Sequence, residues 1–235
     1  MKKQTSIISI GYWGLTIVLL AAGAIRVIYF TPVEQTMGPI QKIFYLHLPV
    51  AICTFFACLT CFIASVGYLS QKRRFFDDLA DGSAKVAVVL CSIVLATGMI
   101  WGKSAWGQWW TWSPRLTFSL VLFLLYVVYL MIRASVESST RRGTVAAVYG
   151  IIAFLDVPLV FLSVRLMPDI HPNNIQLEPA MKLTLAICAV PVVLAAAGLI
   201  RLAYVLNARK HAGEAIGFEP IQRPSMLVAG NGGQP

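Results

Sequence analysis

Charged side chains are scarce in this sequence. Asp, Glu, Lys and Arg make up 12% of its 235 residues, about half of the ~25% that is typical of a soluble domain. Hydrophobic residues make up 58% of the chain, which is more than one water-soluble core of this size requires. The shortage of charge therefore argues against an ordinary soluble domain and favours a membrane protein.

Two sequence patterns that would point to other functions are also missing. The chain has no Gly-rich loop of the P-loop type, so any use of ATP has to come from a partner protein. Lys and Arg outnumber Asp and Glu by 19 to 10, but they do not form a basic stripe interleaved with base-stacking aromatic residues. We therefore expect no nucleic-acid partner.

The apolar residues fall into six runs, and a helical span needs about 20 residues to cross a bilayer. The runs are 7–30, 43–69, 86–101, 116–132, 145–165 and 181–206. This pattern predicts an all-α membrane protein with six transmembrane helices, which form one domain over residues 1–206. Residues 207–235 contain Gly, Pro and Asn with little periodicity, so we expect a disordered cytoplasmic tail there.

Lys and Arg are unevenly distributed between the two sides of this arrangement. With both termini in the cytoplasm, 13 of the 19 fall on the cytoplasmic side, and the other 6 are Arg26, Lys42, Lys103, Arg115, Arg165 and Lys182. The positive-inside rule therefore predicts that both termini are cytoplasmic. The external segments are then 31–42, 102–115 and 166–180, so that a Trp-rich external loop joins helices three and four.

All five cysteines, Cys53, Cys58, Cys61, Cys91 and Cys188, lie inside predicted helices. The first three match part of the spacing of a plant-type iron–sulfur motif. Cys58 and Cys61 also form a C-x-x-C pair, but Phe62 stands where covalent haem attachment needs His. Packing inside apolar helices is the favoured interpretation, and we predict no disulfide framework.

The segment WGKSAWGQWWTWSPRLT, residues 101–117, holds five of the six tryptophans: Trp101, Trp106, Trp109, Trp110 and Trp112. An ordinary aromatic belt at a membrane interface does not need so many. On a helix, Trp106, Trp109 and Trp110 would share one face. The segment therefore predicts an aromatic platform for a lipid interface, a partner protein or a planar ligand.

Two of the three histidines, His47 and His171, lie at or beside external segments. His47 is about one turn inside helix two, where an imidazole needs a partner, and His171 follows helix five. A haem matches both features, because it has a wide aromatic face and an iron that binds two axial imidazoles. A quinone would match the tryptophans alone, and a divalent metal would match only the histidines and usually needs more ligands.

Three motifs together resemble the haem exporter protein C (CcmC) family. WGQWWTWSPRLT is similar to the family's tryptophan-rich "WWD" signature. YLHLPVA, residues 45–51, is similar to its YxHxPxA motif, and PLVFLSVRLMPDIH, residues 158–171, to its PxxxxSVxxxxxxH motif. The motifs occur in the family's order on a six-span chain, so the resemblance covers nearly everything except the tail.

The resemblance implies that His47 and His171 are the axial ligands of a haem b iron, and that the segment from Trp101 to Arg115 is the haem platform. It implies no enzymatic activity. Members of the family present haem at the outer face of the bacterial inner membrane to a periplasmic haem chaperone (CcmE-like) during c-type cytochrome maturation. The implied partners are ABC transporter subunits (CcmA- and CcmB-like), a small one-span protein (CcmD-like) and membrane lipid.

One position departs from the family pattern. The signature usually has Asp after its last Trp, whereas this chain has Ser113 followed by Pro114. Proline suits the first turn of a helix and serine suits the N-cap, so we expect the start of helix four to be preserved. The loss of the carboxylate leaves Arg115 freer to bind a haem propionate. A degenerate paralogue with weakened transfer is the alternative interpretation.

Two competing functions fit parts of the sequence. A CcsA-type haem channel and attachment protein would act directly on apocytochrome, but such proteins usually carry more spans and more histidines. A non-haem transporter or channel subunit would use Trp101–Trp112 as an interfacial lid. Haem absorbance would separate the haem functions from the last one, and co-purification with an ATPase would separate the first two.

Overall fold

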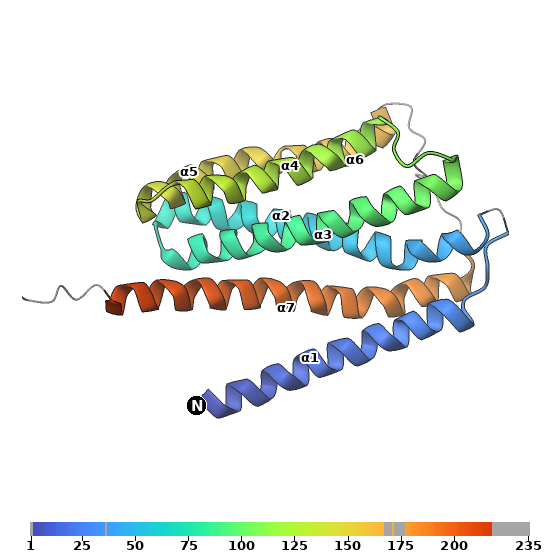
Figure 1. The fold of residues 1–235 in the computed structure, drawn as a ribbon, viewed down its shortest axis with the longest axis horizontal. Helices are drawn as coiled ribbons and strands as arrows, with labels where there is room; N and C mark the ends of the chain where they lie inside the picture. The colour runs from blue at the N-terminus through green and yellow to red at the C-terminus, as the bar shows by residue number, and fades with distance from the viewer. Residues whose placement is uncertain (1, 36, 167–170, 172–176, 218–235) are drawn as a thin grey trace, which may run out of the picture.

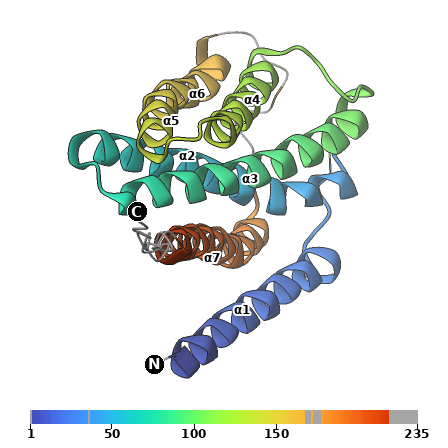
Figure 2. The same cartoon turned by 60° about the vertical axis from the view of Figure 1, so that its left-hand side comes forward.

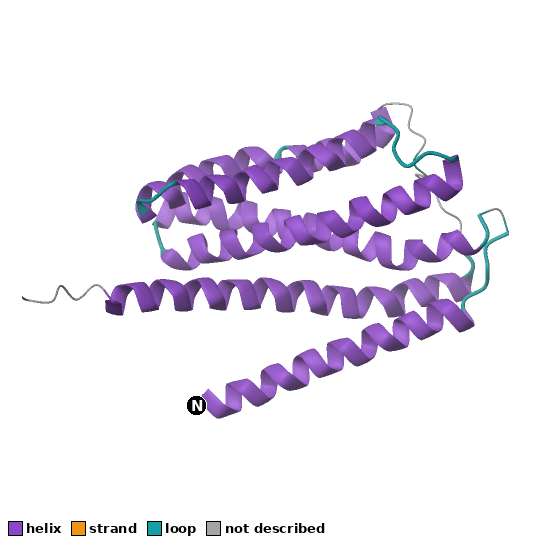
Figure 3. Ribbon diagram, in the orientation of Figure 1, coloured by secondary structure: helices purple, strands orange, loops and turns teal. Residues whose placement is uncertain are grey.

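The computed structural model describes residues 2–35, 37–166, 171 and 177–217. Helices make up almost all of this part of the chain (Figure 3), and it contains no strand. The helices are α1 (Lys2–Ile25), α2 (Phe44–Gln71), α3 (Arg74–Trp106), α4 (Pro114–Ser135), α5 (Ser139–Phe154), α6 (Asp156–Leu166) and α7 (Pro179–Gly217). A π-helical turn, η1 (Arg26–Phe30), and a 3-10 turn, η2 (Pro39–Ile43), lie between α1 and α2.

Six helical stretches are long and apolar enough to cross a membrane, which confirms the predicted six spans. They are Ile7–Phe30, Pro39–Gln71, Arg74–Trp106, Pro114–Ser135, Thr140–Ser163 and Pro179–Ala212. Two ends differ most from the apolar runs. Helix α3 begins at Arg74 rather than near residue 86, and α7 continues to Gly217. Residues 207–217, which we expected in a disordered tail, are therefore helical, and residues 218–235 lie outside the described part.

The helices form a layered bundle (Figure 1). Helices α2 and α3 pack against each other at its centre, with α4, α5 and α6 on one side and α7 on the other. Helix α1 packs on α7 and diverges from it toward the N-terminus (Figure 2). The N-terminus and the end of α7 lie at one end of the bundle, here called the terminal end, and the α3–α4 connection lies at the opposite end.

Small side chains let α2 and α3 approach closely. Ala57, Cys58, Cys61, Ala84 and Ala87 are almost completely buried in the core cluster between these helices and their neighbours. Small residues of this kind favour close packing of membrane helices. All five cysteines are buried and none forms a disulfide, so the geometry supports their interpretation as packing residues.

A network of buried charges lies at the terminal end and explains the early start of α3. Asp77, Asp78 and Asp81 are buried in the first turns of α3. Arg133 of α4 lies 2.6 Å from a carboxylate oxygen of Asp77 and 2.8 Å from one of Asp81. His211 of α7 lies 2.8 Å from Asp78. These contacts connect three helices and let a polar stretch pack inside the bundle.

The fifth span is broken near its middle. Helix α5 ends at Phe154 and α6 begins at Asp156, two residues before Pro158. Proline has no N–H to donate to the carbonyl four residues earlier, which here belongs to Phe154. Helix α6 packs against α4 after the break. The second half of the span, after the break, lines a cavity together with α2, α3 and α4.

Candidate functional site

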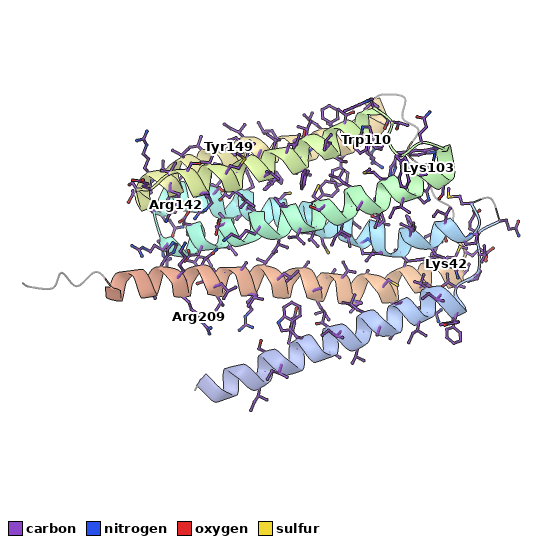
Figure 4. All side chains as sticks on the ribbon, viewed as in Figure 1. Lys42, Lys103, Trp110, Arg142, Tyr149 and Arg209 are labelled. Atoms are coloured by element: carbon purple, nitrogen blue, oxygen red, sulfur yellow. The ribbon has the colours of Figure 1, made fainter. Side chains whose placement is uncertain are left out.

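A cavity of about 480 Å³ lies among α2, α3, α4, α6 and the start of α7. Its volume falls within the ~300–1,000 Å³ typical of small-molecule sites. Trp110, one of its lining residues, lies with Lys103 at the end of the bundle opposite Arg142 and Arg209 (Figure 4), here called the Trp end. Aromatic side chains form much of the wall: Phe44, Phe55, Trp101, Trp106, Trp110 and Phe161.

Six of the eight predicted site residues line this one cavity: His47, Trp101, Trp106, Trp110, Arg115 and His171. They come from α2, α3, α4 and the segments that follow α3 and α6. Trp109 and Trp112 are not among the lining residues, and they are 55% and 76% exposed. Trp112 packs edge-on against Trp110, with ring centroids 5.9 Å apart.

His47 lies in the first turns of α2 and is held by two consecutive residues of α3. Its Nδ1 lies 2.8 Å from Oγ1 of Thr97. Gly98 faces the edge of the ring, because a Cβ at this position would lie 3.4 Å from Cε1 of His47. Helix α3 therefore fixes one side of the imidazole, while the ring lines the cavity.

His171 is brought to the cavity by its contact with Arg115, in the first turn of α4. Nη1 of Arg115 lies 3.1 Å from Nδ1 of His171. A guanidinium group can only donate hydrogen bonds, so this ring nitrogen accepts. The ring of His171 also lies beside Trp101, with centroids 6.3 Å apart and the planes inclined by 44°. A basic group, an imidazole and an indole thus meet on one wall.

The Trp-rich segment is only partly a loop. Helix α3 includes Trp101 and Trp106, whose rings meet edge-to-face at a centroid distance of 5.0 Å. Gly107 then ends the helix in the left-handed conformation, with φ of 75°, and its N–H donates to the carbonyl of Lys103. Glycine adopts this conformation without strain. Trp109 and Trp110 follow the helix end, so the predicted helical face shared with Trp106 is wrong.

Helix α4 begins at Pro114 with Ser113 at the N-cap, as predicted, but the Ser113 side chain makes no capping hydrogen bond. Its hydroxyl is buried and has no partner within the described residues. The indole N–H of Trp110 is also buried there without a partner. Such unpaired polar atoms are costly in the free protein, and a ligand oxygen would satisfy the indole N–H.

The residues present fit a planar macrocycle that carries a metal and carboxylates. Aromatic side chains offer contact to a flat face, and two imidazoles can serve as metal ligands. The guanidinium of Arg115 and the indole N–H of Trp110 are donors suited to carboxylate oxygens. Haem combines all three of these features.

Several residues that line the cavity were not predicted from the sequence. They include Phe55, Ser119, Val160, Phe161, Leu177 and Leu185 around the cavity, together with Thr97 behind His47. Apolar residues in an apolar helix give no signal of their own. Thr97 had one signal, since it precedes Trp101 by four residues and therefore shares its helix face.

The fold and the cavity define a polytopic α-helical membrane protein with an aromatic cavity at one end that two histidines line. The family model described as "Heme exporter protein C" (CcmC) matches residues 2–216, so the chain belongs to this family. The family handles haem in cytochrome c maturation, and its members are transport components rather than enzymes.

Individual relatives agree with the family model. The "Heme exporter protein C" of Rhodobacter capsulatus is 31% identical over 148 residues, which cover 63% of this chain and 60% of that protein. The protein of the same name from Bradyrhizobium diazoefficiens is 30% identical over 66% of this chain and 59% of its own length. The Escherichia coli K12 protein is 29% identical over 71% of this chain and 70% of its own. The match thus spans less than two thirds of the first two relatives.

Proposed function

We propose that this protein binds haem b in the cavity at the Trp end and presents it to a periplasmic haem chaperone (CcmE-like) during c-type cytochrome maturation. The observation that carries the proposal is the convergence of His47, His171 and Arg115 with three tryptophans on one cavity. Haem is the cargo in this scheme, and the chain performs no chemistry on the porphyrin.

Different residues of the cavity contact different parts of the haem. His47 and His171, which both line the cavity, bind the iron. Trp101, Trp106 and Trp110 contact the porphyrin face, and Trp109 and Trp112 extend this platform at the rim. Arg115 binds a propionate, since a charge-assisted hydrogen bond to a carboxylate is stronger than one to a neutral acceptor.

The proposal includes an orientation and a set of partners. The Trp end faces the periplasm, and both termini face the cytoplasm, because Lys and Arg are concentrated on the terminal side. In this orientation the protein spans the bacterial inner membrane with its haem site outside. Release of the loaded chaperone depends on ABC transporter subunits (CcmA- and CcmB-like), and a one-span protein (CcmD-like) completes the complex.

The test is haem binding by the detergent-purified protein and its variants. The wild type is expected to show the sharp reduced bands of a low-spin, six-coordinate iron. His47→Ala or His171→Ala should each leave a five-coordinate or water-ligated iron and weaken binding. The double variant should lose stable haem binding. A double variant with the haem content and spectrum of the wild type would refute the ligand assignment.

His211→Ala is the matched control for removing an imidazole, because His211 lies at the terminal end. The variant should keep the haem spectrum, although the loss of the contact between His211 and Asp78 is expected to lower stability. Transfer is measured by mixing haem-loaded protein with a purified CcmE-like chaperone. The two single cavity variants should transfer less haem than His211→Ala does.

A further inference from the structure

The side chain of Thr97 lies between His47 and the backbone of its own helix. Its Oγ1 is 2.8 Å from Nδ1 of His47. The same oxygen donates to the carbonyl of Ile93 at 2.7 Å, with the carbonyl of Val94 at 3.2 Å. Thr97 therefore makes contacts in two directions with a hydroxyl that has a single hydrogen.

The hydrogen bond of Thr97 to its own helix bears on which group donates in the contact between Thr97 and His47. The hydroxyl of Thr97 donates to the carbonyl of Ile93 at 2.7 Å, and the carbonyl of Val94 is a second acceptor at 3.2 Å. Threonine in membrane helices commonly makes this bond to the carbonyl four residues earlier. When the hydroxyl hydrogen is in this intrahelical bond, the oxygen can only accept toward His47, which requires a hydrogen on Nδ1 of the ring. In the neutral imidazole, Nε2 is left with its lone pair.

Packing against Gly98 adds a second constraint on the ring. Nδ1 contacts Thr97, and the neighbouring ring atom Cε1 lies beside Gly98, where an added Cβ would be 3.4 Å away, in ordinary van der Waals contact. Thr97 thus favours one tautomer of His47, and Thr97 and Gly98 together limit the orientation of its ring.

We propose that Thr97 is a positioning residue that prepares Nε2 of His47 to bind iron before haem arrives. This inference rests on the proposed haem-binding function. Metal-bound histidines generally donate their other ring N–H to an acceptor, which fixes the tautomer and makes the ring a stronger donor. The hydroxyl oxygen of Thr97 is such an acceptor. His171 is set differently, because its Nδ1 accepts from Arg115.

Substitution of the hydroxyl tests the proposal. Thr97→Val keeps the shape of the side chain and removes the acceptor, and the Kd for haem should rise roughly 10–100-fold. Because Nδ1–H loses its acceptor, His47 becomes a weaker donor to ferric iron, and the reduction potential of the bound haem should rise. Thr97→Ser keeps the hydroxyl and should restore both properties to near their wild-type values.

Thr60→Val is the matched control. Thr60 lies on α2, is half-buried, and donates to the carbonyl of Phe56 at 2.8 Å, so this variant removes the same intrahelical bond at a residue that does not line the cavity. The Kd and the potential should stay at their wild-type values. If Thr97→Val also leaves both unchanged, or if Thr97→Ser behaves like Thr97→Val, the positioning role is wrong.

A measurement without substitution at Thr97 keeps the test valid if Thr97→Val does not fold. ¹⁵N-histidine NMR of the haem-free full-length protein, with His171→Gln and His211→Gln present, reports which ring nitrogen of His47 carries the hydrogen. Hydrogen on Nδ1 supports the inference, and hydrogen on Nε2 overturns it. The proposed function fails separately, if the wild type binds no haem or if His47→Ala binds haem with an unchanged spectrum.

Discussion

Nη1 of Arg115 lies 3.1 Å from Nδ1 of His171, so the start of α4 and the segment after α6 meet at the cavity. Because the guanidinium donates, a neutral His171 in this contact carries its hydrogen on Nε2. Nε2 cannot bind iron in that form. A carboxylate is a stronger partner for a guanidinium than a neutral imidazole is, so a haem propionate is expected to draw Arg115 away from His171.

The first prediction concerns the affinity that Arg115 contributes. Arg115→Ala should raise the Kd for haem about tenfold or more, since a hydrogen bond to a charged group contributes about 1.5–3 kcal/mol. The measurement is a haem titration in detergent. Arg165→Ala is the control, because Arg165 is exposed in the last turn of α6 and does not line the cavity. Equal Kd values for the two variants would show that Arg115 does not bind a haem propionate.

A second prediction separates the two contacts of Arg115. Haem dimethyl ester lacks free carboxylates, so in the wild type Arg115 should remain on His171. The iron should then be five-coordinate or water-ligated through His47 alone. In Arg115→Ala the same ester should gain His171 and show a low-spin, six-coordinate spectrum. If the wild type already gives that spectrum with the ester, Arg115 does not restrain His171.

The third prediction concerns Ser113, which stands where the family usually has Asp. Ser113→Asp adds a carboxylate two residues from Arg115 that competes with a propionate for the guanidinium. A partly exposed ion pair contributes about 0.2–1 kcal/mol, so the Kd for haem should rise by up to about fivefold. Ser113→Asn is the control, because it caps a helix equally well without charge. The same Kd in both variants would contradict the competition.

The fourth prediction is the orientation in the membrane. Reporter fusions after Gly107 and after Asn174 should be read as periplasmic. A fusion after Arg209, at the terminal end, should be read as cytoplasmic. The reason is the excess of Lys and Arg on the terminal side. A cytoplasmic reading at Gly107 would reverse the proposed side of haem delivery.

The sequence predicted the six spans because apolar runs are read directly by hydropathy. It also selected His47, His171 and Arg115, because polar side chains near the ends of spans are rare and stand out. All three line one cavity. Their meeting depends on helix packing, which no local pattern in the sequence reports.

The features that were missed depend on contacts between distant segments. In the sequence, little distinguishes Thr97 from other intramembrane threonines, and only the fold brings its hydroxyl within 2.8 Å of His47 on α2. The helical extension of α7 was read as tail, but Asn207 donates to the carbonyl of Asp78 and His211 contacts the carboxylate of the same residue. The early start of α3 was likewise hidden, because hydropathy counts buried carboxylates as polar without regard to their partners.

The last prediction tests those partners. The side chain of Arg133 is 9% exposed and pairs with Asp77 and Asp81, whose side chains are 11% and 10% exposed. Removing one partner of a buried ion pair leaves uncompensated charge and typically costs about 3–5 kcal/mol. Arg133→Ala should therefore lower the free energy of unfolding in detergent by about that amount, whereas the control Arg209→Ala, at an exposed site of the same end, should change it little.

A second variant distinguishes charge from packing. In Arg133→Met with Asp77→Asn and Asp81→Asn, the three buried charges are removed together. Lys85, which also pairs with Asp81, keeps its charge but is 48% exposed, so much of the lost stability should return. The Kd for haem should remain close to the wild-type value in the folded protein, because the cavity lies at the Trp end. If Arg133→Ala costs less than about 1 kcal/mol, the size of a surface ion pair, the ion pairs of Arg133 do not hold α3 and α4 together.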